Sequence, residues 1–137
     1  MFASKKALGN HGERLAEVWY RAAGYTIIGR NIRCGRNEAD LLCGSGKTVI
    51  IVEVKTRSSK KYGPPLEAIY HRKLLRLASF GQEWIRKHPK FTHWQVDIIG
   101  LAFHPQACFG SLDWLPNVAI TMPESSLDGQ TTYPVRW

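Results

Sequence analysis

Acidic residues and a lysine interrupt two apolar segments in the middle of the 137-residue chain. Glu38 and Asp40 fall in the first segment, and Glu53 and Lys55 fall in the second. Burying a charge is unfavourable unless the charge is paired or bound to a metal. Carboxylates beside an ammonium suit Mg²⁺ or Mn²⁺, and such an ion lowers the pKa of bound water and neutralises charge on a scissile phosphate. The spacing Asp-x(12)-Glu-x-Lys is therefore typical of a metal-dependent phosphodiesterase.

Whether these side chains meet depends on the turn between the two segments. The Gly-Ser-Gly-Lys stretch after Cys43 is typical of a hairpin loop, which would pair Cys43 with Thr48. Glu38 would then lie opposite Glu53. Side chains alternate along a strand and cross-strand partners share a face, so this register puts Asp40 on the same face as Glu53. A register changed by one residue would put Asp40 on the opposite face.

Helices and strands are expected to alternate along the chain. Apolar residues recur at helical spacing over residues 4–23 and 66–87. Strands are expected over five further segments: 25–28 continuing into 31–33, 38–43, 48–56, 95–103 and 117–122. This order predicts a single α/β domain, a mixed central sheet flanked by helices with an αβββαβ core. Residues 1–123 are assigned to this domain, and residues 124–137 to a loosely packed C-terminal tail.

Composition favours a polyanionic partner. Lys and Arg number 19 against 11 Asp and Glu, a net charge of +8, which favours nucleic acid over an acidic membrane surface. The longest apolar run, 49–52, is too short to cross a bilayer, so no membrane association is expected. The start of the chain lacks the apolar stretch of a secretory signal. Three cysteines without a CxxC motif indicate reduced thiols in a cytoplasmic protein.

Several motifs together resemble a known family. They are Gly12-Glu13, Ala23-Gly24-Tyr25, Asn31-x-Arg33, Glu38-Ala39-Asp40-Leu41-Leu42, VIIVEVKTR at 49–57, Tyr62-Gly63-x-Pro65, Ala68, Lys73 and Val96-Asp97. Over roughly residues 8–101 the chain resembles the YraN-type family of small bacterial proteins. That family is placed in the PD-(D/E)XK nuclease superfamily, whose members have restriction-endonuclease-like folds. Asn37 stands where the family usually has glycine.

The resemblance implies roles for individual residues. Asp40 and Glu53 would be metal ligands, with the Val54 carbonyl as a third. Lys55 would be the catalytic lysine. Glu13, from the first helix, would complete or orient the catalytic site. Two further acids are expected to matter less: Glu38 in a supporting role, and Asp97 at a strand surface.

Basic residues on both sides of the acids could follow a phosphate backbone past the metal. The predicted nucleic-acid-binding residues are Arg57, Lys60, Lys61, Arg72, Lys73, Arg76 and Arg33. Arg30 and Arg36 lie in the same stretch as Arg33 and could flank the site with it. Solvated side chains on a loop and a helix explain some of these positions equally well.

The leading hypothesis is a metal-dependent nuclease that hydrolyses phosphodiester bonds in DNA, in preference to RNA, with branched or nicked DNA as candidate substrates. A homodimer would suit cutting of both strands. Three alternatives stay open: an ion pair of Lys55 with the two acids at the edge of a surface, a nucleic-acid binding module that does not cut, and an adaptor whose basic face meets another protein.

Overall fold

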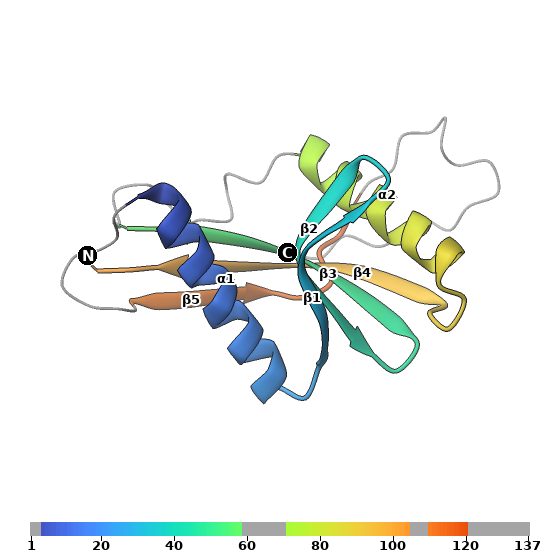
Figure 1. The fold of residues 1–137 in the computed structure, drawn as a ribbon, viewed down its shortest axis with the longest axis horizontal. Helices are drawn as coiled ribbons and strands as arrows, with labels where there is room; N and C mark the ends of the chain where they lie inside the picture. Colours follow the sequence, from blue (N-terminus) through green and yellow to red (C-terminus); the bar gives the residue numbers. More distant parts are fainter. Residues whose placement is uncertain (1–3, 59–70, 105–109, 121–137) are drawn as a thin grey trace.

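A five-stranded mixed sheet forms the centre of the protein in the computed structural model, which describes residues 4–58, 71–104 and 110–120. The elements along the chain are α1 (Lys5–Ala22), β1 (Thr26–Cys34), β2 (Asn37–Ser45), β3 (Thr48–Arg57), α2 (His71–Lys87), β4 (His93–Ala102) and β5 (Ser111–Leu115). Strands β1, β2 and β3 form an antiparallel meander, β4 pairs parallel to β3, and β5 pairs antiparallel to β4 (Figure 1). The expected αβββαβ order is confirmed, with β5 added, and the fold is consistent with a restriction-endonuclease-like domain.

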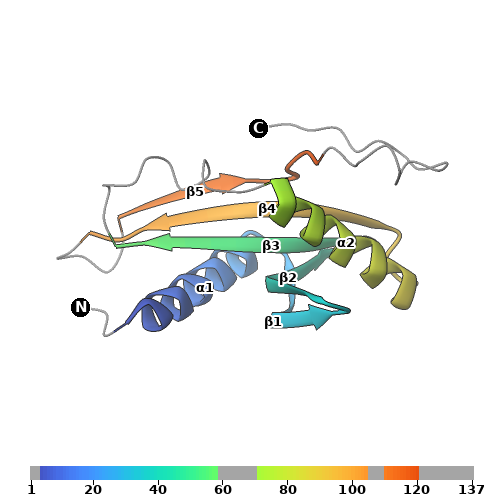
Figure 2. The ribbon, with the colours of Figure 1, turned by 90° about the horizontal axis from the view of Figure 1, so that it is seen from above.

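The two helices cover opposite faces of the sheet (Figures 1 and 2). Along β3, Ile50 and Val52 pack with Tyr20 of α1, whereas Val49 and Ile51 pack with the residues of α2. This alternation explains why the central strand is apolar on both faces. Neither helix in the described ranges is long and apolar enough to cross a membrane.

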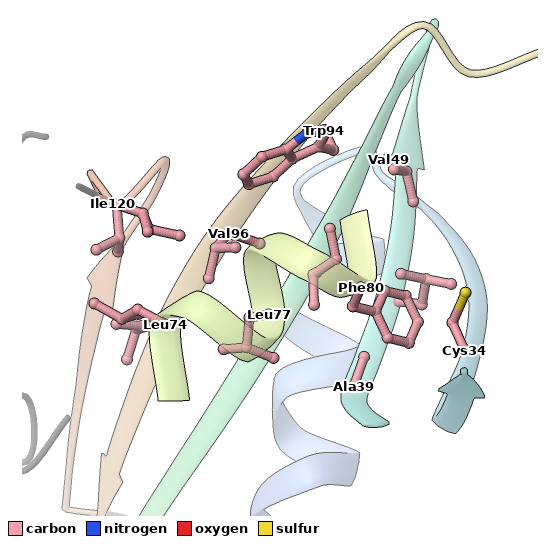
Figure 3. Close-up of a cluster of buried hydrophobic side chains, with 14 of the residues drawn as sticks. Cys34, Ala39, Val49, Leu74, Leu77, Phe80, Trp94, Val96 and Ile120 are labelled. Atoms are coloured by element: carbon pink, nitrogen blue, oxygen red, sulfur yellow. The ribbon is translucent and has the colours of Figure 1, made fainter. Parts of the chain in front are cut away.

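The larger apolar core lies between α2 and the sheet (Figure 3). Leu74, Leu77 and Phe80 of α2 belong to one buried cluster with Val49 of β3 and Val96 of β4. Each of these side chains is at most 4% exposed, and burying one such side chain contributes about 1.5–3 kcal/mol. The core therefore fixes α2 across β3 and β4, and with it the residues at the start of the helix.

The predicted register of the β2–β3 hairpin is wrong by two residues. Ser45 pairs with Thr48, so the loop is the two-residue turn Gly46–Lys47 rather than a four-residue loop. Gly46 has a φ of +58°, which glycine adopts without the strain that a Cβ causes, so the tighter turn is favoured. Glu38 is therefore not opposite Glu53. A shift of two residues preserves the face of every side chain on a regular strand, so the shift alone does not separate Asp40 from Glu53.

The prediction of a last strand over residues 117–122 is also wrong for the part that the structure describes. Residues 117–120 are not a strand, because Val118 and Ile120 instead fill the core beneath α2 and the Val118 N–H bonds the Val96 carbonyl oxygen at 2.7 Å. The edge strand β5 comes earlier, over a five-residue segment that is too short for alternation to reveal. Residues 66–70 of the expected second helix, residues 121–122 and the tail at 124–137 lie outside the described residues.

The prediction that Asp97 lies at a strand surface is wrong, because Asp97 lies in the interior of the protein. It is 0% exposed, because its strand β4 is flanked by β3 and β5 and covered by α1. Its carboxylate accepts hydrogen bonds from the Tyr20 hydroxyl at 2.7 Å, Gln95 Nε2 at 2.9 Å, the Asn117 backbone N–H at 2.9 Å and, more weakly, Trp114 Nε1 at 3.4 Å. Asp97 thus joins α1 to β4 and β5.

Replacing Asp97 with alanine should lower the free energy of unfolding by about 3 kcal/mol or more, because several buried donors lose their acceptor at once. Urea unfolding followed by circular dichroism measures this. Asp113→Ala, at an exposed position on β5, is the matched control and should change stability by less than about 0.5 kcal/mol. Equal effects of the two substitutions would contradict the structural role assigned to Asp97.

Candidate active site

The candidate site lies where β2 and β3 separate. The ladder between these strands ends at the pair Leu41 and Val52. One residue further along β2, the Asp40 carboxylate takes the place of a backbone partner, because its Oδ2 accepts a hydrogen bond from the Val54 N–H at 2.8 Å. The N–H and C=O of one strand residue point to the same edge, so the Val54 carbonyl also faces the side on which Asp40 lies.

A break in the alternation of β2 accompanies this separation. Ala39 and Leu42 both pack in the core beneath α2, although residues three apart on a regular strand face opposite sides. On the neighbouring strand β1, Asn31 has a left-handed φ of +53° between the pairs that Arg30 and Ile32 make with β2. The hairpin is therefore irregular at Asp40, which leaves that carboxylate in the gap between β2 and β3.

Glu53 is buried beside this gap on the face that α2 covers. It is 2% exposed, and its Oε1 forms an ion pair at 2.8 Å with Nζ of Lys73, near the start of α2. Its Oε2 is buried and has no hydrogen-bond partner among the residues that the structure describes. A buried carboxylate oxygen without a partner is unfavourable, so this atom marks a position where a ligand would stabilise the protein.

The two carboxylates affect each other's pKa in opposite directions: the charge of Asp40 raises the pKa of Glu53, whereas a hydrogen bond with Glu53 lowers that of Asp40. Burial raises the pKa of Glu53 to about 7, and the negative charge of Asp40 adds to this effect, while Lys73 opposes it. Burial also raises the pKa of Asp40, and the Val54 N–H opposes that shift. Two such groups in one site retain a proton near neutral pH unless a cation replaces it.

Helix α1 brings a third acid to the site. Glu13 is half-buried, and burial and then the charge of Asp40 raise its pKa. Its Oε1 accepts a hydrogen bond from Asn31 Nδ2 at 3.1 Å. The preceding residue, Gly12, lies so close to β3 that a Cβ there would overlap the Thr56 side chain. This close approach of α1 to β3 holds Glu13 beside the separation of β2 and β3.

Lys55 follows Glu53 on the same face of β3. It is half-buried, and its charge lowers the pKa of both Asp40 and Glu53, so it lies beside the pair. The ion pair of Glu53 is with Lys73, however, and Glu53 is buried rather than at a surface edge. The interpretation of a surface ion pair with Lys55 is therefore wrong for Glu53.

The donor set fits a divalent cation that also binds water or substrate. Within 4–58, 71–104 and 110–120, no group of three or more His, Cys, Asp or Glu side chains converges closely enough to enclose a metal. Mg²⁺, however, is usually bound by one or two carboxylates and completes its shell with water and phosphate oxygens. Asp40, Glu53 and the Val54 carbonyl provide such a partial shell, and the unpartnered Glu53 Oε2 supports the fit.

The predicted cations separate into those near the acids and those elsewhere. Lys73 and Arg76 line a cavity of about 220 Å³ together with Arg36, which belongs to the turn between β1 and β2. Arg33 instead forms an exposed ion pair with Glu38 at 3.7 Å. Arg72 is exposed and Arg57 is half-buried, while Lys60 and Lys61 lie outside the described residues.

Two contributions to this site were missed in the sequence. The first is the left-handed backbone of Asn31, which makes the β1–β2 hairpin irregular opposite Asp40. Asparagine tolerates this conformation better than most residues, so its presence in the motif Asn31-x-Arg33 could have indicated the irregularity. No signal in the sequence indicated that Lys73 contacts Glu53, since the two residues belong to different elements.

The raised pKa of Glu53 predicts how stability depends on pH in the presence of a chelator. Between the ordinary value of 4.5 and about 7, folded Glu53 holds a proton that the unfolded chain releases, so raising the pH favours unfolding. The free energy of unfolding should therefore fall from pH 5 towards pH 8, and Glu53→Gln should make this fall shallower. Urea unfolding at several pH values measures both slopes.

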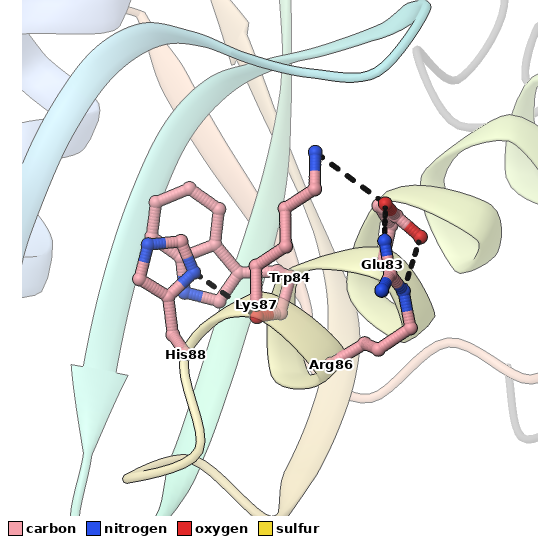
Figure 4. Close-up of polar contacts among 5 residues, drawn as sticks. All are labelled: Glu83, Trp84, Arg86, Lys87 and His88. Atoms are coloured by element: carbon pink, nitrogen blue, oxygen red, sulfur yellow. Dashed lines mark hydrogen bonds and ion pairs between the residues drawn. The ribbon is translucent and has the colours of Figure 1, made fainter.

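Glu83→Gln is the matched control for this measurement. Hydrogen bonds from Arg86 hold the pKa of Glu83 at about 2, and Lys87 adds to the effect (Figure 4). Glu83 therefore titrates below the measured range, and its replacement should leave the slope as in the unmodified protein. A slope that is the same with and without Glu53 would contradict the assigned burial of this carboxylate.

Comparison with known proteins places these residues in a family context. The model of the uncharacterised protein family UPF0102 matches residues 12–101, a range that contains Glu13, Asp40, Glu53 and Lys55. A UPF0102 protein of Leifsonia xyli subsp. xyli is 43% identical over 100 residues, which cover 72% of this chain and 85% of the relative. A UPF0102 protein of Geobacter metallireducens is 34% identical over 118 residues, which cover 85% and 95%. Since the family model matches well over half of the chain and these relatives are at least 34% identical over most of their own length, the chain belongs to the UPF0102 family.

Proposed function

We propose that the protein is a metal-dependent nuclease that hydrolyses phosphodiester bonds in DNA. The observation that supports this most is the buried Glu53 carboxylate, which lies beside Asp40 with one oxygen unpartnered. A structural ion pair with Lys73 leaves the Asp40 carboxylate unexplained, whereas a divalent cation would use both carboxylates. The net charge of +8 supports a polyanionic substrate.

Three groups would hold the ion: the carboxylates of Asp40 and Glu53 and the carbonyl of Val54. When bound, Mg²⁺ or Mn²⁺ would lower the pKa of a water molecule and offset charge on the scissile phosphate. The Val54 N–H keeps Asp40 oriented towards β3, and Lys73 keeps Glu53 oriented towards α2. The two carboxylates are thus fixed from opposite sides before any substrate arrives.

The other residues of the site would act on water and phosphate. The Lys55 ammonium would donate hydrogen bonds to the attacking water or to a phosphate oxygen and would offset negative charge that develops on that oxygen. Glu13 Oε1 is held by Asn31, so Glu13 would orient the water through its other oxygen, Oε2. The raised pKa of Glu13 makes its carboxylate a stronger base than an exposed glutamate, which suits it to accept a proton from that water.

We also propose that the protein is cytoplasmic. Cys34 and Cys43 are buried free thiols, which is the expected state of cysteine in a reducing compartment.

Cleavage assays test the nuclease. Linear duplex, single-stranded, nicked and four-way-junction DNA are each incubated with Mg²⁺, Mn²⁺ or EDTA, and an RNA strand is included for comparison. Cleavage should require the metal, and Asp40→Asn and Lys55→Ala should each reduce its rate by about 100-fold or more, because each removes a group that contacts the ion or the reacting phosphate.

Lys47→Ala is the matched control for Lys55→Ala. Lys47 is an exposed lysine in the turn at the opposite end of β3, and its replacement lowers the net charge by the same one unit. Its cleavage rate should stay within about twofold of the unmodified protein. Binding to DNA without cleavage of any substrate would favour the non-catalytic binding module. Cleavage that survives both Asp40→Asn and Lys55→Ala would come from another enzyme in the preparation.

A further inference from the structure

The cavity beside the candidate metal site has a chemistry of its own. It has a volume of about 220 Å³ and lies between the start of β2 and the first turns of α2. Two arginines, one lysine, an amide and a carboxylate surround it, with one apolar side chain: Arg36, Asn37, Glu38, Lys73, Arg76 and Leu77. A cavity with three cationic residues and one acid attracts an anion.

The single acid of this cavity does not cancel its charge. The Glu38 carboxylate already forms an ion pair with Arg33 at 3.7 Å, outside the residues that line the cavity. Lys73 is also partly committed, because its Nζ is bound to Glu53. Arg36 and Arg76 are exposed, and no hydrogen bond or ion pair within the described ranges occupies either guanidinium. Among the residues that the structure describes, two planar guanidinium groups therefore remain available for an anionic ligand.

Guanidinium groups favour one class of anion. Arginine donates paired hydrogen bonds that match the oxygens of carboxylates and phosphates, and the adjoining candidate site is suited to a phosphodiester. Lys73 lines the cavity and contacts Glu53 at 2.8 Å, so the cavity adjoins the candidate metal site directly. A nucleic-acid strand with one phosphate at Asp40 and Glu53 would therefore pass beside this cavity, since Lys73 belongs to both sites.

We propose that this cavity, formed by Arg36 and Arg76 with Lys73, binds a phosphate group of the nucleic-acid substrate next to the phosphate that is cut. This inference rests on the proposed nuclease function. The bound group would be either the terminal phosphate of a strand or an internal phosphate of its backbone, and both offer the same oxygens to the two arginines.

Binding without cleavage tests this inference separately from the nuclease. The full chain is titrated in EDTA with inorganic phosphate and with a short single-stranded DNA in three forms: 5′-phosphorylated, 3′-phosphorylated and with hydroxyl groups at both ends. Fluorescence anisotropy gives Kd for the strands, and NMR chemical shifts of the arginine side chains report on inorganic phosphate. No arm requires metal or catalysis, so a failed cleavage assay leaves this measurement valid.

Arg36→Gln and Arg76→Gln should each raise Kd for DNA by about tenfold. Each should also reduce the slope of log Kd against log salt concentration by about 1, the value for one lost phosphate contact. Arg86→Gln is the matched control, because Arg86 lies at the other end of the same helix, where it pairs with Glu83 (Figure 4). Its Kd should change by less than about twofold. Since all three arginines are exposed, the variants should keep the circular dichroism spectrum of the unmodified protein.

The three strands distinguish the source of the phosphate. A terminal phosphate as ligand predicts tighter binding of one phosphorylated strand and loss of that preference in Arg36→Gln and Arg76→Gln. An internal phosphate predicts equal binding of all strands and an equal loss in both variants. The proposal would be overturned if Arg36→Gln and Arg76→Gln bound every strand with the same Kd as the control Arg86→Gln.

Discussion

The structure of the candidate site depends on one buried charge, the carboxylate of Glu53. A carboxylate that is 2% exposed must be compensated, and Lys73 compensates only one of its two oxygens. Asp40 adds a second negative charge beside it, which increases the need for a cation or a proton. The arrangement is therefore poorly suited to a purely structural role, for which an apolar pair would be more stable.

The rest of the fold holds that charge in place. The apolar side chains of α2 fix the helix on β3 and β4, and so bring Lys73 to Glu53. On the other face, the close contact at Gly12 and the hydrogen bonds of Asp97 fix α1, which carries Glu13. Helices packed on opposite faces thus deliver groups to a single opening between two strands. Because α2 also forms one wall of the basic cavity, the same packing fixes the position of the proposed phosphate site.

The order of helices and strands could be predicted from the sequence, because apolar residues recur at regular spacing along each element. The hairpin brought Asp40 close to Glu53 in the prediction, although the register was wrong by two residues and the alternation of β2 breaks at Asp40. The contact of Lys73 with Glu53 could not be predicted, since it depends on how α2 crosses the sheet. The burial of Asp97 was missed for a similar reason: it results from α1 and β5 covering β4, and β5 was itself too short to recognise.

The central claim is that Asp40 and Glu53 together bind a divalent cation, and calorimetric titration with Mn²⁺ tests it most directly. We expect one binding site per chain that is lost in Asp40→Asn and in Glu53→Gln. Because the pair retains a proton near neutral pH, binding should release it, so the measured heat should change between buffers of different ionisation enthalpy. Absence of Mn²⁺ binding to the unmodified protein, or binding that persists in both variants, would contradict this account.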